Sequence, residues 1–119
     1  NKHYLYSSFQ KFDKINIIEK GVEDVIEINW LAEVEKRKDD LLKDLEGLLR
    51  IASVKDLTTS TPEYPMGEKI GEALDYVLAL AKNEGFKTKN LDGFAGFAEW
   101  GESEDYIGVL AHVDVVPAP

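Results

Sequence analysis

The hydrophobic residues of this chain change their period once, from helical to strand-like, and this change constrains the fold more than any other feature. Over residues 29–49 they recur at steps of three and four, which predicts one amphipathic helix with Asn29 as its N-cap. A second stretch with the same period starts near Gly67 or Glu68, and Gly85 is placed to end it. The predicted apolar face of this second helix consists of Ile70, Ala73, Leu74, Val77, Leu78 and Ala81.

Beyond Gly85 the period becomes two, which is typical of β-strands. Residues 87–91 and 94–100 are predicted to form a hairpin around a tight turn at Asp92-Gly93. Residues 106–111 are almost all apolar, which predicts a buried strand in the interior of a sheet. The order helix, helix, hairpin, buried strand therefore predicts an α/β fold.

The charge balance limits the partners of the chain. Its 119 residues contain 23 acidic and 14 basic side chains, for a net charge of -9, which would repel nucleic acid. The absence of cysteine excludes disulfides and thiolate metal sites. No apolar run reaches the roughly 20 residues of a membrane span, and no secretory signal is present. We expect a cytoplasmic protein with neither nucleic acid nor membrane as a partner; the composition leaves its oligomeric state open.

Residues 1–28 carry aromatic and aliphatic side chains without a sustained period, so we treat them as an unpatterned N-terminal extension of the region 29–119. Met66 is the only methionine, and Asn1 is therefore not an ordinary start. Residues 19–22, Glu-Lys-Gly-Val, are what a purine-rich ribosome-binding sequence would encode if translated. One hypothesis is accordingly that residues 1–24 are a miscalled leader and that translation starts near Val25.

His112 and Asp114 are the candidate site residues, and they follow directly after the predicted buried strand. In an extended chain, residues two apart project from the same face. Imidazole is a common zinc ligand, and a metal-bound histidine usually donates its second ring N–H to a carboxylate. The pair therefore has the groups for one metal ligand and one orienting acid. Taken alone, the spacing fits a satisfied polar pair better than a metal site.

The amino-acid sequence around this pair is more specific. V-L-A-H-V-D-V-V-P-A at 109–118 closely resembles the H-x-D-V-V-P segment of the di-zinc metallopeptidase family, which includes aminoacylases, glutamate carboxypeptidases and PepV-type dipeptidases. L-L-R-I-A-S-V at 48–54, with Ala52 where proline is usual, resembles a second segment of that family, and residues 65–86 resemble its following helix. K-T-K-N-L-D-G-F-A-G at 87–96 is most similar to the PepV-type branch. The resemblance extends over about residues 29–118.

This resemblance implies the N-terminal portion of a zinc-peptidase catalytic domain, with the two helices, hairpin and buried strand belonging to a larger mixed sheet. It implies a metal-activated water that hydrolyses the peptide bond of a dipeptide or small peptide, with two zinc ions, or manganese or cobalt, as cofactor. His112 matches the first metal ligand, and Asp114 matches the catalytic-site aspartate that holds this histidine.

The remaining ligands and the general base of the family have no counterpart up to Pro119, which stands where the family has glycine. Because one histidine cannot hold two zinc ions, we predict that the 119-residue chain alone is inactive and that the domain is truncated. Two alternatives remain open. One is an N-acyl amino acid deacylase or aminoacylase of the same family, and the other is a non-catalytic α/β interaction module.

Overall fold

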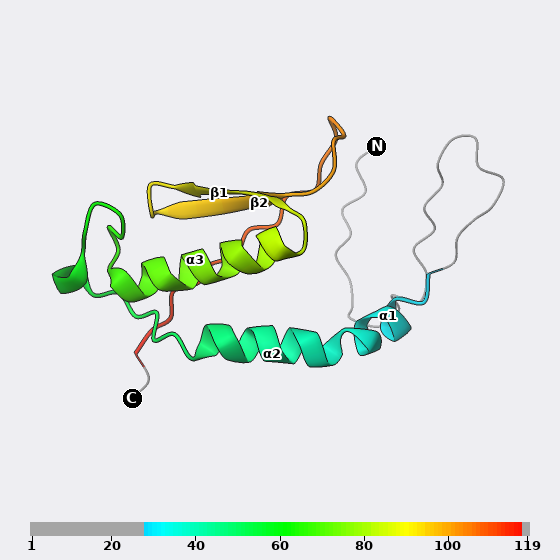
Figure 1. The fold of residues 1–119 in the computed structure, drawn as a ribbon, viewed down its shortest axis with the longest axis horizontal. Coiled ribbons are helices and arrows are strands. Elements are labelled where there is room, and N and C mark those ends of the chain that lie inside the picture. Colours follow the sequence, from blue (N-terminus) through cyan, green and yellow to red (C-terminus); the bar gives the residue numbers. More distant parts are fainter. Residues whose placement is uncertain (1–27, 118–119) are drawn as a thin grey trace, which may run out of the picture. The chain divides into compact units, whose positions relative to one another are not determined.

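The structure, a computed structural model, describes residues 28–117 (Figure 1). The predicted N-terminal extension lies outside the described residues except for Ile28. The chain divides into two compact units between Leu42 and Lys43. None of the helices within the described residues is long and apolar enough to cross a membrane.

The described residues form three α-helices, one short 3-10 helix and one antiparallel pair of strands, which is the composition of a partial α/β domain. In chain order the elements are α1 (Trp30–Lys36), α2 (Lys38–Leu49), η1 (Leu57–Thr59), α3 (Glu68–Asn83), β1 (Lys87–Leu91) and β2 (Ala95–Glu99) (Figure 1). The α/β class predicted from the hydrophobic periods is thus confirmed.

The helix predicted over residues 29–49 is two helices, which corrects the expectation of one. Asn29 caps α1 as predicted, because its side chain accepts a hydrogen bond from the backbone N–H of Ala32 at 3.1 Å. At Arg37 the backbone N–H donates to the carbonyl of Val34 at 3.0 Å, and the regular helix is interrupted for one residue. Residues 35–40 are all charged, so no apolar contact there favours one continuous helix.

The apolar stripe of these helices faces solvent within the described residues. Six of its seven members are exposed, namely Leu31, Val34, Leu41, Leu42, Leu45 and Leu49, whereas Leu48 is half-buried. A stripe of this kind forms from local spacing alone, whereas its burial requires a neighbouring element. One contact in the second unit does reach α2, since the hydroxyl of Tyr76 on α3 donates to the carbonyl of Asp44 at 3.1 Å.

The core of the second unit lies between α3 and the hairpin. Ile70, Ala73 and Leu74 are its buried apolar side chains, and β1 and β2 both pack along α3 (Figure 1). Gly96 on β2 permits this approach, because a Cβ there would lie 2.9 Å from a methyl group of Leu78. The predicted apolar face of the helix is therefore the face that packs.

The C-terminal end of α3 follows the sequence prediction. Gly85 has a φ of +89°, its N–H donates to the carbonyl of Lys82, and the N–H of Phe86 donates to that of Ala81. This pair of bonds is a Schellman motif, which ends α3 where glycine was expected to end it.

The hairpin turns at Asp92-Gly93 as predicted, but its return strand is Ala95–Glu99 and not 94–100, because Phe94 belongs to the turn. Lys87 pairs with Glu99 and Leu91 pairs with Ala95 across β1 and β2. Asp92 and Gly93 between them both have positive φ, of 54° and 72°. That is the conformation for which an Asp-Gly pair is favoured in tight hairpins.

The buried strand predicted over residues 106–111 is wrong for the described residues. The segment has no regular secondary structure, and Ile107 and Leu110 are 94% and 99% exposed. Strands are stabilised by hydrogen bonds to a neighbour, and within residues 28–117 no strand pairs with this segment. An apolar composition indicates that a segment is more stable when buried, but burial requires another element of the protein that covers it.

Candidate functional site

The segment that carries His112 and Asp114 is attached to the rest of the second unit through Ser53. The hydroxyl of Ser53 donates to the carbonyl of Val113 at 2.7 Å, and the carbonyl of Ser53 accepts from the N–H of Val115 at 3.0 Å. Val54 and Val115 form an isolated parallel bridge at the same place. Two segments separated by about 60 residues are therefore held side by side.

Ser53 is positioned by two tight turns after α2. Its N–H donates to the carbonyl of Ile51 at 2.8 Å, and the N–H of Val54 donates to that of Ala52 at 2.7 Å. Consecutive three-residue turns of this kind direct the chain sharply at the end of a helix. Ser53 is 2% exposed, the one buried polar side chain among residues 28–117. Its hydroxyl is hydrogen-bonded, as a buried polar group requires.

His112 and Asp114 are brought together as their spacing predicts. The ring atom Nδ1 of His112 lies 3.0 Å from the backbone carbonyl oxygen of Asp114 and 3.3 Å from its carboxylate Oδ1. The carbonyl is the closer partner, so the ring is oriented by the backbone of Asp114 as well as by its side chain. The two side chains are 82% and 59% exposed, which makes this a weak surface contact in terms of stability.

This contact selects one tautomer of His112. Both oxygens near Nδ1 act as hydrogen-bond acceptors, so the favourable arrangement places the ring hydrogen on Nδ1. In the neutral ring, Nε2 then carries the lone pair and is the atom suited to bind a metal ion. Chemically, the arrangement is a carboxylate-oriented histidine with one ring nitrogen facing its orienting residue.

The residues present match the donor chemistry of zinc but supply only part of a site. Imidazole nitrogen and carboxylate oxygen are both zinc ligands. Within residues 28–117, however, no three histidine, aspartate or glutamate side chains gather closely enough to hold a metal ion. His112 and Asp114 therefore fit one corner of a zinc site.

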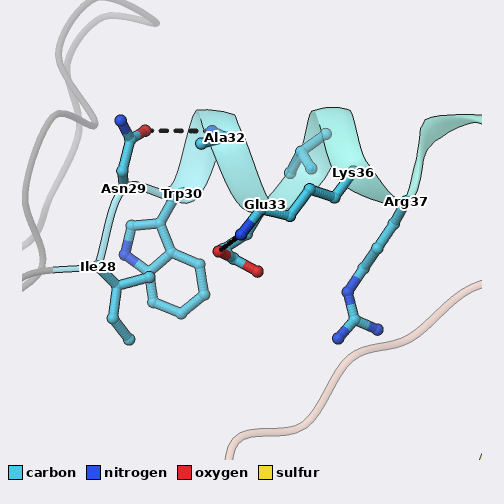
Figure 2. A pocket seen from close by; sticks show the side chains of 8 residues that line it. Ile28, Asn29, Trp30, Ala32, Glu33, Lys36 and Arg37 are labelled. Carbon is cyan, nitrogen blue, oxygen red and sulfur yellow. Dashed lines mark hydrogen bonds and ion pairs between the residues drawn. The ribbon is translucent and has the colours of Figure 1, made fainter.

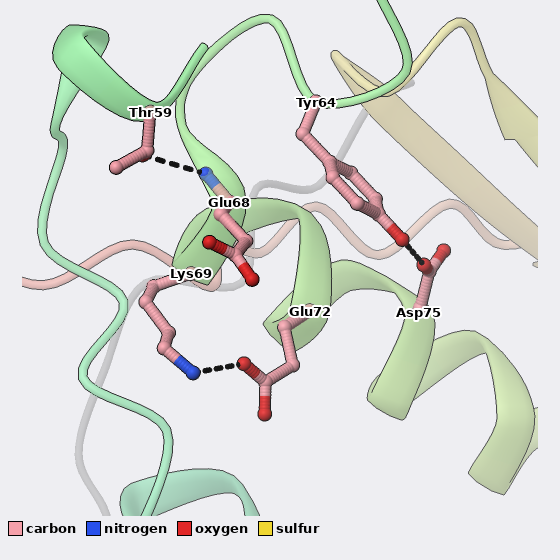
Figure 3. Close-up of polar contacts among 6 residues, drawn as sticks. All are labelled: Thr59, Tyr64, Glu68, Lys69, Glu72 and Asp75. Atoms are coloured by element: carbon pink, nitrogen blue, oxygen red, sulfur yellow. Dashed lines mark hydrogen bonds and ion pairs between the residues drawn. The ribbon is translucent and has the colours of Figure 1, made fainter. Parts of the chain in front are cut away.

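A second polar cluster connects the loop before α3 with the hairpin. The hydroxyl of Tyr64 donates to Asp75 on α3 at 3.1 Å (Figure 3), and the side-chain amide of Asn90 donates to the other oxygen of Asp75 at 3.1 Å. The hydrogen bond to Asp75, and then its negative charge, raise the pKa of Tyr64 above its usual value. The N–H of Gly93 donates to Asn90 at 2.8 Å, so the cluster extends to the hairpin turn.

One ion pair and one hydrogen bond lie near the start of α3. Lys69 pairs with Glu72 at 2.5 Å, which raises the pKa of Lys69, and the N–H of Glu68 donates to the hydroxyl of Thr59 (Figure 3). These groups are at the surface, so they add little to stability. The bond between Thr59 and Glu68 connects the preceding loop to the first turn of α3, whereas the pair Lys69–Glu72 lies within the helix.

An open hollow in the first unit contains none of the predicted site residues. The side chains of Ile28 and Trp30 lie beside each other at its edge, and Lys36 pairs with Glu33 at 2.6 Å (Figure 2). The ammonium group of Lys36, by hydrogen bond and charge, lowers the pKa of Glu33. The full lining is Ile28, Asn29, Trp30, Ala32, Glu33, Val34, Lys36 and Arg37. All lining residues belong to the single segment 28–37, which contains α1 and its two caps.

Sequence reasoning missed Ser53. The segment L-L-R-I-A-S-V that contains it carries only a family resemblance, and its bond to Val113 joins residues 60 apart in the chain. No local pattern indicates a contact over that separation.

The chain is similar to several curated bacterial proteins. It is 56% identical over 90 residues to a protein of Bacillus subtilis (strain 168) named "Putative dipeptidase YtjP", which covers 76% of this chain and 19% of that protein. It is 44% identical over 89 residues to a "Putative dipeptidase" of Staphylococcus epidermidis, covering 75% of this chain and 19% of the relative. A Staphylococcus aureus (strain USA300) relative of the same designation is 42% identical over 89 residues, with the same two coverages.

The chain thus spans about a fifth of the length of the curated relatives that it matches. No protein-family profile matches it. The identities relate this chain to proteins named as dipeptidases.

Proposed function

We propose that this chain is part of a zinc-dependent dipeptidase, closest to the PepV-type dipeptidases, and that it contributes the first metal ligand. The observation that supports this most directly is the contact between His112 and Asp114, in a chain similar to proteins named as dipeptidases. The designation of these relatives favours a peptide bond as the substrate over the amide of an N-acyl amino acid. It also favours an enzyme over a non-catalytic module.

In this proposal, His112 holds a zinc ion through Nε2, and Asp114 acts through His112. The contacts at Nδ1 keep the ring in the tautomer that ligation requires and limit its rotation. When bound, zinc would polarise the scissile carbonyl and lower the pKa of the attacking water.

The complete site needs groups that the described residues do not contain. Two zinc ions require roughly four or five protein ligands, and residues 28–117 offer one oriented histidine. The other ligands and the general base would come from the remaining part of a protein as long as the relatives. Dipeptide hydrolysis is therefore proposed for such a complete protein, and the 119-residue chain by itself is expected to be inactive.

A chimera tests this proposal. The chain replaces the corresponding segment of the Bacillus subtilis relative, and zinc content and dipeptide hydrolysis are measured beside the unmodified relative. We expect His112→Ala to lose one of two bound zinc ions together with activity. Asp114→Asn should retain more zinc than His112→Ala but should also lose activity, because the His112 ring loses its charged partner.

The matched control is Asp105→Asn, which removes the charge of another exposed aspartate near the site segment. It should leave both readouts unchanged. Unchanged zinc content in His112→Ala would contradict the assignment of this histidine as a ligand. Hydrolysis of N-acyl amino acids in preference to dipeptides would instead indicate the deacylase branch of the family.

A further inference from the structure

We propose that Ser53 is a positioning residue for His112 and Asp114. Its hydroxyl and carbonyl together hold the backbone on both sides of Asp114 and so determine the direction in which the two side chains point. The role in metal binding rests on the proposed function, whereas the role in holding the segment rests on the hydrogen bonds alone.

The two bonds of Ser53 bracket Asp114. The hydroxyl binds the carbonyl of Val113, the residue before, and the carbonyl binds the N–H of Val115, the residue after. Because successive side chains of an extended segment alternate between faces, anchoring residues 113 and 115 places His112 and Asp114 together on the other face. The contact from Nδ1 of His112 to Asp114 is the result.

The preceding segment differs from residues 112–115 in its contacts. Residues 106–111 make no regular pairing within the described part of the chain, and their apolar side chains are exposed. Order returns at Val113, which is partly buried, where the Ser53 hydroxyl makes its bond. Ser53 is thus the group that separates an unpaired stretch from the ordered pair of site residues.

The alternative is that Ser53 merely satisfies its own buried hydroxyl. The two interpretations predict that removal of the hydroxyl lowers amide protection in different parts of the unit. A satisfied core hydroxyl would affect the unit as a whole, including the protected amides of α3. A positioning residue would change the segment 112–115 and leave α3 protected.

Nuclear magnetic resonance on the 119-residue chain without metal separates these interpretations. The amide exchange rate of Val115 reports the anchor, the exchange rate of Leu74 on α3 reports the core, and the ring ¹⁵N shifts of His112 report its tautomer. Ser53→Ala removes the hydroxyl bond to Val113 but keeps the carbonyl that accepts from Val115. We expect the amide exchange rate of Val115 to increase about tenfold, because the loss of one buried hydrogen bond weakens the attachment of the whole segment. The exchange rate of Leu74 should not change. The His112 ring should also lose its preference for hydrogen on Nδ1.

Ser53→Thr, which retains a hydroxyl, should restore slow exchange at Val115 and the tautomer. Ser60→Ala is the matched control, because the hydroxyl of Ser60 also donates to a backbone carbonyl, that of Pro65 at 2.9 Å. It should leave Val115 and His112 as they are. Ser53→Cys, of similar size with a weaker donor, is expected to give an intermediate exchange rate.

Unchanged Val115 exchange in Ser53→Ala would overturn the proposal. Loss of protection at Leu74 in both Ser53→Ala and Ser53→Cys would also overturn it, since Ser53 would then act on the whole core. These readouts involve no metal, so they are independent of the zinc content of the chimera. A chimera without zinc would refute the proposed function while the exchange result would stand.

Discussion

The hydroxyl of Ser53 and the carbonyl of Val113 are 2.7 Å apart although the two residues are 60 positions apart in the chain. This hydrogen bond joins the turn after α2 to the segment that carries His112 and Asp114. The candidate site is consequently not a local feature of its own segment. Substitutions at Ser53 and substitutions in the core between α3 and the hairpin should have effects that can be told apart.

Truncation of Leu74 tests whether α3 and the hairpin form the core of the second unit. Leu74→Ala should lower the free energy of unfolding by about 2–5 kcal/mol, because it removes a buried side chain and leaves a cavity. Leu110→Ala makes the same chemical change at a side chain that is 99% exposed, and its effect should stay within about 0.5 kcal/mol. Urea denaturation measures both, and a comparable loss in the two variants would place residues 106–111 in the core.

Gly47→Ala should destabilise the chain, although such a change usually stabilises a helix by roughly 0.5–1 kcal/mol. A Cβ at Gly47 would lie 2.0 Å from the hydroxyl oxygen of Tyr76, which donates to Asp44 on the same helix. The clash would separate α2 from α3 or force Tyr76 to another rotamer. Gly108→Ala is the control, since a Cβ there has no neighbour within 4 Å. A higher unfolding midpoint for Gly47→Ala would contradict this packing.

Tyr64 should make stability depend on pH in the alkaline range. The hydrogen bond to Asp75 raises the pKa of Tyr64 in the folded chain, so its contribution is fully present below the unfolded value of about 10. That contribution is lost as the pH rises through the higher folded value. Absorbance at 295 nm should assign the later-titrating tyrosine by comparison of Tyr64→Phe with the parent chain.

Denaturation midpoints complete this test. The difference between Tyr64→Phe and the parent chain should be constant below pH of about 10 and disappear at higher pH. Tyr106→Phe, at an exposed tyrosine, should match the parent chain throughout. A midpoint difference that grows with rising pH would mean that the pKa of Tyr64 is lowered in the folded chain, which would exclude the bond to Asp75.

The 119-residue chain should show no dipeptide hydrolysis with zinc or manganese, because its described residues contain no group of three metal-binding side chains. In the same chain, His112→Ala should change the free energy of unfolding by less than about 0.5 kcal/mol, since the side chain is largely exposed. A loss of zinc by this variant in the chimera would then reflect ligand chemistry and not misfolding. Measurable turnover by the purified 119-residue chain would refute the inference that its metal site is incomplete.

The elements that could be predicted are those whose causes lie close together in the chain. The hairpin strand 87–91 and its Asp92-Gly93 turn follow from a period of two and from residues that accept positive φ. The helix α3 follows from its apolar spacing, and its end follows from Gly85. The spacing that lets the side chains of His112 and Asp114 share one face is likewise local.

The features that could not be predicted depend on a second surface. The apolar residues 106–111 have the composition of a buried strand, yet within the described residues no strand covers them. The break at Arg37 separates two helices that share one stripe. The sequence by itself determined α3, the hairpin and the spacing that lets His112 and Asp114 share one face, because φ preferences and side-chain periods act over a few residues. Only the tertiary structure decided that Ser53 anchors that pair, because a hydrogen bond over 60 residues depends on how the chain between them folds.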